Sequence, residues 1–294
     1  MIILKDYINN LMIKIDFSKS EIDYFIDLSE KTKNSELINL SQQFVLTDCS
    51  YDQILTKLKE YASIYNIHLY SITMLFYLYC SYTLEKLYKK HNIPNAIFLN
   101  TMRDLKCKLL ECENIHGIMG TFVGEWYVGF FKMQRFGIGR LQYEHREFKR
   151  DIYTKDRLTI EKGDTVYNIH IPSMGPLTKQ SRLDSYKKAY TFYQKELKGG
   201  PMVIVCSSWL LYPDNKSFYP NNSNIISFMD DFDYIWRVEK DSFDDGWRIF
   251  GKDYKKPVTE LPQNTSLQRA YVGYLLSGKM PGLGYGIKIY KPQD

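Results

Sequence analysis

The chain has 294 residues, of which 44% are hydrophobic and 15% aromatic, and its formal net charge is +5. This length predicts a large core divided between two domains, while so mild a charge excludes a typical nucleic-acid-binding protein and is compatible with an anionic small ligand. The five cysteines are odd in number and lack the spacing of a zinc site, which predicts a cytoplasmic protein without a metal.

Residues 1–116 are predicted to form a helical domain. The first ten residues, MIILKDYINN, lack the apolar core and the cleavage site of a signal peptide, so we expect no export. Ser18 with Glu21, and Ser50 with Gln53, have the spacing of capping boxes. Each pair precedes apolar residues that recur every three or four positions, which indicates two amphipathic helices.

The most apolar stretch of this domain lies from Ile72 to Cys80. It is shorter than the roughly 20 residues that a membrane-spanning helix needs, so we expect no membrane partner. The longer segment 68–90 predicts a buried central helix, and Pro94 marks the start of a further helix that runs to about Cys112.

Four glycines then break the helical period and open a second domain, residues 117–294. Aromatic and β-branched residues dominate 121–133 and 136–144, which favours strands, with Gln134 and Arg135 at the turn of a hairpin. The glycines are Gly117, Gly120, Gly124 and Gly129.

The rest of this domain alternates strand and helix, which is typical of an α/β fold. In the strand 166–171, Asn168 and His170 alternate with apolar residues and so share one face. The apolar strand that follows is predicted to lie parallel to it at the centre of the sheet. The run 282–286, GLGYG, is read as a turn, because a dinucleotide loop would open a helix. Further elements are predicted from periodicity at 183–197, 202–210, 223–232, 234–239, 265–277 and 287–290.

Three segments carry a resemblance to a family of bacterial N-acyltransferases in which a helical domain precedes a GNAT-like domain. They are HIPSMGPL at 170–177, CSSWLL with SNIISF at 206–228, and LPQNTSLQRA at 261–270, and RLQYE at 140–144 is also similar. The resemblance covers nearly the full chain. It implies an α/β (α+β) protein with a mixed, splayed central sheet. It also implies that acetyl-CoA or another acyl-CoA binds between two splayed parallel strands and acylates a small-molecule or peptide amine.

The segment after the first of these strands differs from the usual GNAT pyrophosphate loop, which has Gln or Arg, two residues, Gly, one residue, and Gly or Ala. SMGPLTKQS at 173–181 does not reproduce that pattern. The N-terminus of the following helix still offers unpaired N–H groups to phosphates. The alternative, weighed equally, is that this segment is only a turn and a helix cap. The candidate contacts are Ile171, Ser173, Gly175, Thr178, Lys179 and Ser181, with Asn224 at a later helix start.

His170 is the first candidate for a general base. It ends a strand at the edge where open α/β sheets place their ligands, and an imidazole titrates near neutral pH. The alternative is a structural histidine that bonds its neighbours. Alternation places Arg140, Gln142 and Glu144 on one face, so Glu144 is a second candidate base or an amine-positioning group; its alternative is a solvent-facing ion pair.

A third candidate is Ser207, whose hydroxyl can bond the thioester carbonyl or His170. Trp209 shares its face and is read as core more readily than as a ligand contact. Neither Cys206 nor any serine stands in a GxSxG elbow, which favours direct attack of an amine on acyl-CoA. The rival hypothesis is a noncatalytic GNAT-like module that binds a small ligand or a protein.

Overall fold

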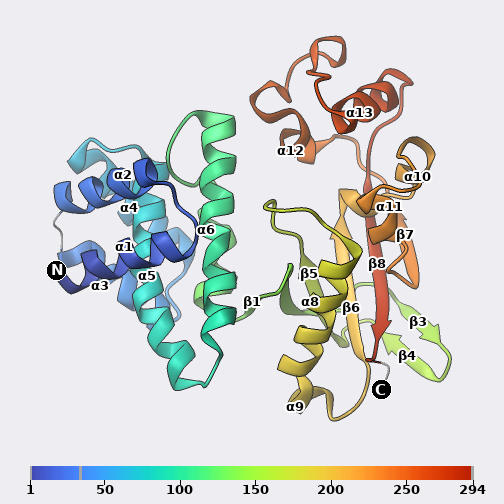
Figure 1. Ribbon diagram of the computed structural model, residues 1–294, viewed down its shortest axis with the longest axis horizontal. Helices are drawn as coiled ribbons and strands as arrows, with labels where there is room; N and C mark the ends of the chain where they lie inside the picture. Colours follow the sequence, from blue (N-terminus) through green and yellow to red (C-terminus); the bar gives the residue numbers. More distant parts are fainter. Residues whose placement is uncertain (1, 33–34, 293–294) are drawn as a thin grey trace. The chain divides into compact units, whose positions relative to one another are not determined.

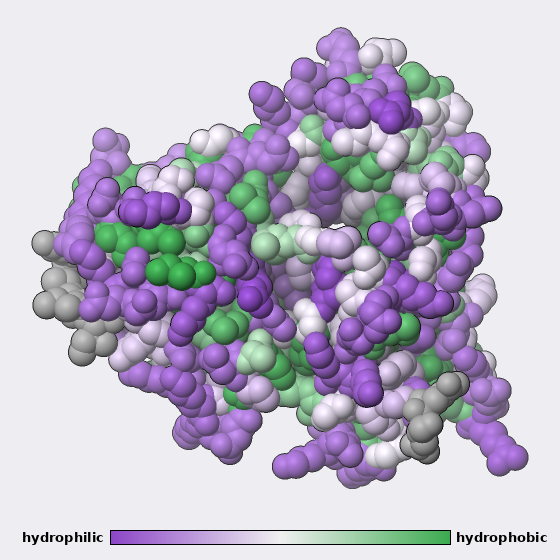
Figure 2. Space-filling model, in the orientation of Figure 1, coloured by the Kyte–Doolittle hydropathy of each residue, from purple (hydrophilic) through white to green (hydrophobic). Residues whose placement is uncertain are grey.

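The computed structural model describes residues 2–32 and 35–292, and Figure 1 shows its helices and strands. The chain divides into two compact units, Met1–Gly137 and Ile138–Asp294, so residues 117–137 belong with the helical unit. On the face drawn in Figure 2, hydrophilic residues predominate and apolar residues form small separate patches. None of the helices in the described ranges is long and apolar enough to cross a membrane.

The first unit is a helical bundle organised around α5. Every side chain from Ser71 to Ser81 is buried, as expected of a central helix. The capping boxes predicted at Ser18 and Ser50 are both present at the starts of α2 and α4. The helices of the bundle are α1 (Ile2–Lys14), α2 (Lys19–Lys31), α3 (Ser35–Leu46), α4 (Tyr51–Tyr65), α5 (Leu69–Lys90) and α6 (Asn95–His116).

The strand predicted over 121–133 is wrong. This segment forms the short helices η1 (Gly124–Tyr127) and α7 (Val128–Phe131). Its aromatic side chains pack against α5, where the ring of Phe131 stacks on that of Tyr77 at 5.1 Å between centroids. Burial of these rings in the helical bundle outweighs their strand propensity.

The hairpin turn predicted at Gln134 and Arg135 is also wrong. The turn lies at Gly139 and Arg140, between β1 (Arg135–Ile138) and β2 (Leu141–Glu147). Gly139 has φ +65°, a conformation that costs glycine little, and a side chain there would press on Ser185.

The main sheet has the strand order β1-β2-β5-β6-β8-β7. β5 and β6 are parallel, whereas the pairs β2 with β5, β6 with β8, and β7 with β8 are antiparallel, so the predicted mixed sheet is confirmed. The remaining strands of this sheet are β5 (Thr165–His170), β6 (Met202–Ser208), β7 (Tyr234–Val238) and β8 (Leu283–Tyr290). A separate hairpin, which the sequence did not predict, pairs β3 (Ile152–Lys155) with β4 (Leu158–Glu161).

The predicted turn at 282–286 is wrong, because β8 already begins at Leu283. Its glycines serve close packing. A Cβ atom added to Gly284 would lie 2.0 Å from the carbonyl oxygen of Leu211, and one added to Gly286 would lie 2.6 Å from the ring of Phe232. The strand therefore requires glycine because neighbouring chain crosses it closely.

Two apolar layers cover the sheet of the second unit. On one face, Val166, Val205, Tyr285 and Ile287 form a core cluster with Phe148. Helix α8 follows β5 after the loop 171–178 and covers the other face, where its Tyr186 packs on Tyr290 of β8. The helices of this unit are α8 (Lys179–Phe192), α9 (Gln194–Leu197), η2 (Trp209–Leu211), α10 (Asn215–Phe218), α11 (Asn224–Met229), η3 (Asp244–Gly246), α12 (Trp247–Phe250), η4 (Gly251–Asp253), η5 (Val258–Glu260) and α13 (Ser266–Leu276).

Candidate active site

The two parallel strands at the centre of the sheet separate toward their carboxyl ends. In the described chain, β5 and β6 pair at Tyr167 with Ile204 and at Asn168 with Val205, and no further Cα pair joins them. β6 itself continues to Ser208, paired with β8. The strands are therefore splayed beyond Asn168, as the resemblance implies, and His170 lies beside the opening.

His170 and Glu144 form a hydrogen-bonded pair on one face of the sheet. Their strands are antiparallel neighbours, in which Glu144 faces Asn168 and Gln142 faces His170. The carboxylate Oε1 lies 2.7 Å from Nε2 of the imidazole. Sequence alternation predicted which face of its own strand each side chain occupies. The register of β2 against β5 brings the two side chains together.

The environment of this pair is asymmetric. The Glu144 side chain is only 4% exposed, whereas that of His170 is 23% exposed and can reach a ligand. The same carboxylate oxygen also accepts from Arg146 Nε at 2.9 Å and Asn168 Nδ2 at 3.3 Å. Glu144 does form an ion pair, with the largely exposed Arg146, but its own carboxylate is buried and does not face solvent.

Hydrogen bonding assigns a tautomer to His170. With Glu144 ionised, its carboxylate only accepts, so the 2.7 Å contact requires the imidazole hydrogen on Nε2. The Asn168 amide nitrogen, which lies 3.0 Å from Nε2 and 3.3 Å from Oε1, then donates to the carboxylate. The lone pair of the neutral ring is then on Nδ1, which is the nitrogen that can accept a proton. Arg146 was not singled out from the sequence, although extending the alternation by two residues beyond Glu144 would have found it.

Ser207 stands on the same sheet face, opposite Tyr285 of β8, and is exposed. Its hydroxyl makes no hydrogen bond within the described residues, so the structure does not bring it together with His170. Trp209, which the sequence placed on the same strand face, lies instead in η2. Its ring packs edge-on against Tyr271 at 5.7 Å, and the residue is partly buried.

The candidate phosphate contacts lie in the loop after β5 and in the first turn of α8. Thr178 is the N-cap of α8, and its Oγ1 accepts from the Ser181 backbone N–H at 3.2 Å. Gly175 has φ +76° and is exposed, as are Ser173 and Lys179. The capping role is therefore real, and it leaves the first N–H groups of α8 available to a ligand.

Two more of the candidates lie just after β5 and at the start of α11. Ile171 follows His170 directly and is partly buried. Asn224 is the exposed first residue of α11, and the cap of that helix is Ser223, whose Oγ accepts from the Ile226 N–H at 3.1 Å. Capping thus accounts for Ser223, while Asn224 has no part in it.

Two arginines hold the loop between β5 and α8. Arg140, in the turn before β2, donates from Nη2 to the Gly175 carbonyl at 2.9 Å and from Nε to the Pro176 carbonyl at 3.2 Å. Arg182, in α8, donates from Nη1 to the Leu177 carbonyl at 2.7 Å. Arg140 therefore does not line up with Gln142 and Glu144 as the sequence predicted, since it lies in the turn and reaches this loop.

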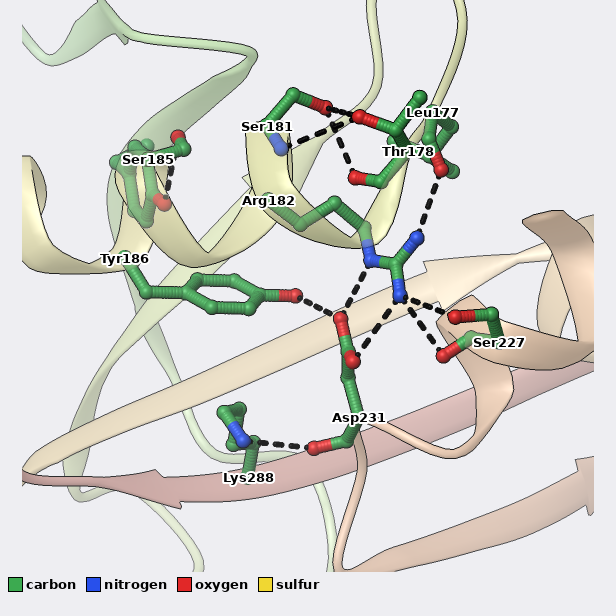
Figure 3. Close-up of polar contacts among 10 residues, drawn as sticks. Leu177, Thr178, Ser181, Arg182, Ser185, Tyr186, Ser227, Asp231 and Lys288 are labelled. Carbon is green, nitrogen blue, oxygen red and sulfur yellow. Dashed lines mark hydrogen bonds and ion pairs between the residues drawn. The ribbon is translucent and has the colours of Figure 1, made fainter.

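Arg182 is fully buried and firmly anchored (Figure 3). Its guanidinium binds both carboxylate oxygens of Asp231, at 2.6 Å from Nε and 3.1 Å from Nη2. Nη2 also donates to the carbonyl of Ser227 at 2.8 Å. The Tyr186 hydroxyl and the Lys288 ammonium donate to Asp231, to its carboxylate and its carbonyl respectively. The network joins α8 to the segment between α11 and β7.

Burial shifts the pKa of several groups in the second unit. It raises the pKa of Tyr186 well above its usual value of 10.0, and desolvation lowers the pKa of Lys288 below 10.5. Burial also raises the pKa of the Cys206 thiol to about 12, which makes it a poor nucleophile at neutral pH.

Among residues 2–32 and 35–292 there is no grouping of His, Cys, Asp and Glu suited to holding a metal ion.

Comparison with solved structures shows the same fold in acyltransferases. A mutant acyltransferase in complex with octanoyl-CoA is 16% identical with a TM-score of 0.74, and an acyltransferase in complex with decanoyl-CoA is 19% identical with a TM-score of 0.72. Each comparison covers 96% of this chain and 87% of the other. An acyltransferase in complex with decanoyl-CoA and teicoplanin, 17% identical with a TM-score of 0.64, covers 97% and 99%. No curated protein matches the chain.

Family models account for nearly the whole sequence. Residues 6–133 match the N-acyltransferase N-terminal domain, and residues 136–288 match the GNAT-like C-terminal domain. The enzyme class predicted from the resemblance, an acyltransferase, is confirmed by these matches. The chain belongs to the N-acyltransferase family that joins a helical N-terminal domain to a GNAT-like C-terminal domain.

Proposed function

We propose that this acyltransferase moves an acyl group from acyl-CoA to an amine by direct attack, with His170 as the general base. The observation that carries the proposal is the 2.7 Å pair of His170 and Glu144 beside the opening between β5 and β6. The base stands where the resemblance implies that the thioester lies. It is also the more exposed member of the pair, so an amine can reach it.

In the proposed step, the amine nitrogen attacks the thioester carbonyl carbon. A C–N bond forms, the C–S bond breaks, His170 Nδ1 takes the proton from the nitrogen, and the thiolate of coenzyme A leaves and is protonated. A thioester is already activated, so the enzyme has chiefly to orient the reactants and to stabilise the oxyanion. The Ser207 hydroxyl, exposed on the same sheet face, is the proposed donor to that oxyanion.

Glu144 has a supporting role in this proposal. Its carboxylate holds the imidazole in the tautomer that leaves the lone pair on Nδ1, and it stabilises the imidazolium once the proton has moved. Three donors already occupy Oε1, and the side chain is only 4% exposed. These contacts favour an orienting carboxylate over a second base.

Acyl-CoA would lie along β5, with its diphosphate at the start of α8. The proposed contacts are Ile171, Ser173, Gly175, Thr178, Lys179 and Ser181 in that segment, with Asn224 at the start of α11. Lys179 adds a positive charge beside the first N–H groups of α8. The acceptor is proposed to be a small-molecule or peptide amine.

Calorimetric titration tests the first half of this function. Coenzyme A, acetyl-CoA, octanoyl-CoA and decanoyl-CoA form the panel, and the last two are the ligands named for the structural neighbours. The proposal predicts binding of at least one of them. Absence of binding at millimolar concentrations of all four would refute it.

Release of free thiol, followed with a chromogenic disulfide and an amine panel that includes teicoplanin, tests the second half. A product heavier than the amine by one acyl group supports amide formation. Thiol release at the same rate without any amine would indicate hydrolysis and contradict N-acyl transfer.

A further inference from the structure

The loop between β5 and α8 is held by an unusual set of hydrogen bonds. Three consecutive carbonyl oxygens, those of Gly175, Pro176 and Leu177, each accept from an arginine N–H. Two of the bonds come from Arg140 and one from Arg182. The loop therefore lies between two guanidinium groups that approach it from different elements, the turn before β2 and helix α8.

Neither arginine is free to drift from its place. Arg182 is completely buried and is fixed by the bidentate contact with Asp231 and by the Ser227 carbonyl, as Figure 3 shows. Arg140 follows Gly139, whose φ of +65° sets the turn, and that turn packs on Ser185 of α8. The Arg182 guanidinium is thus part of the scaffold, and the turn fixes the backbone from which the Arg140 side chain reaches the loop.

This arrangement affects how an anion would meet the start of α8. A carbonyl oxygen carries partial negative charge and repels a diphosphate, whereas one that is bonded to a guanidinium is turned away and neutralised. A loop that is already ordered also loses less conformational freedom when a ligand binds. In the usual GNAT loop, glycines let the backbone N–H groups approach the diphosphate, and this chain lacks that pattern.

We propose that Arg140 and Arg182 are positioning residues for coenzyme A. They hold residues 175–177 so that the start of α8 is open to the diphosphate, and so replace the glycine-rich loop. Neither side chain is assigned a contact with the ligand. The proposal rests on the function proposed above, since it requires that acyl-CoA binds at this loop.

The test compares octanoyl-CoA with octanoyl-pantetheine, which has the same thioester but no phosphate. Arg140→Met should raise KM for octanoyl-CoA about tenfold. It should leave kcat/KM for octanoyl-pantetheine within about twofold. Arg140→Lys keeps the charge but lacks the fixed pair of N–H groups that bond the two carbonyl oxygens. Its KM for octanoyl-CoA should lie between those of the wild type and Arg140→Met. A structural defect alone would lower kcat/KM for both substrates together.

Arg269→Met is the matched control. Arg269 also holds two consecutive loop carbonyls, those of Gln263 and Asn264, at 2.9 and 3.1 Å, but before α13. Arg269→Met should leave unchanged the ratio of kcat/KM for octanoyl-CoA to kcat/KM for octanoyl-pantetheine. The proposal would be overturned if Arg269→Met changed this ratio as strongly as Arg140→Met does. It would also be overturned if Arg140→Met left the ratio unchanged.

Arg182 requires a compensated variant, because Arg182→Met alone leaves the Asp231 carboxylate buried without its main partner. The pair Arg182→Met with Asp231→Asn removes both charges and keeps an acceptor for Tyr186. A folded double variant should show the same selective rise in KM for octanoyl-CoA. If kcat/KM of the wild type is the same for both substrates, the proposed binding of acyl-CoA at this loop fails together with the positioning role. If the wild type favours octanoyl-CoA and the arginine variants do not change that preference, only the positioning role fails.

Discussion

Replacing Glu144 by Gln separates an orienting carboxylate from a catalytic base. The Glu144 oxygen Oε1 accepts from Arg146 Nε, Asn168 Nδ2 and His170 Nε2. Arg146 and Asn168 donate whatever the residue at 144, so the carbonyl oxygen of the new amide should take the place of Oε1. The His170 tautomer is then retained, and the main change is the loss of one negative charge.

The expected cost follows from that single change. A hydrogen bond to a charged group contributes about 1.5–3 kcal/mol, and a neutral one about 0.5–1.5 kcal/mol. The imidazolium formed in the transition state should therefore lose about 1–2 kcal/mol of stabilisation, which corresponds to a decrease of about 5- to 30-fold in kcat. His170→Ala removes the base itself and should cost about 10²- to 10⁴-fold.

The assay is thiol release at saturating acyl-CoA, with circular dichroism and thermal melting to establish that each variant is folded. Glu196→Gln is the matched control, because Glu196 makes a similar 2.9 Å contact with His145, a pair that is far more exposed. It should leave kcat unchanged. An unchanged kcat in Glu144→Gln would refute support of a base by this carboxylate. A loss as large as that of His170→Ala would make Glu144 the proton acceptor.

Three further predictions concern stability and reactivity. Desolvation lowers the folded-state pKa of Lys288 below 10.5, so the unfolded chain binds the proton more tightly between the two values. Urea titrations should therefore show the wild type gaining stability relative to Lys288→Met as pH rises toward 10.5, and a constant difference would refute this. Of the five thiols, only Cys49 is not buried, so one thiol should react quickly with a disulfide reagent in the native state and five in denaturant; rapid labelling of Cys206 would contradict its burial. Gly284→Ala should lower the free energy of unfolding by about 1–3 kcal/mol or more, because the added Cβ would lie 2.0 Å from a backbone oxygen. The Cβ added in Gly175→Ala would have no atom within 4 Å, so this variant should lose only about 1 kcal/mol through backbone strain. Equal melting temperatures for the two alanine variants would be evidence against this packing.

Local signals in the sequence predicted local structure well. The capping boxes at Ser18 and Ser50 depend on side chains three residues apart, and both are present. Alternation placed Asn168 and His170 on one face of β5, and the register with β2 then made the contact with Glu144. The family resemblance supplied the splayed sheet, which no local pattern encodes.

The errors arise where tertiary packing decides. Residues 121–133 have the composition of a strand, but the rings of Tyr127 and Phe131 pack on Tyr77 of α5, and residues 124–131 are helical. Arg182 and Asp231 are 49 residues apart, and a buried arginine in an otherwise polar helix has no sequence signature. Ser207 remains a prediction, because the structure gives it a place on the sheet face but no partner.

A crystal structure of the complex with decanoyl-CoA tests the central claim most directly. The account predicts the thioester carbonyl in the opening between β5 and β6, within reach of His170, and the diphosphate against residues 175–181. A coenzyme A bound elsewhere, or a thioester beyond the reach of the His170 imidazole, would contradict the proposed site and its chemistry.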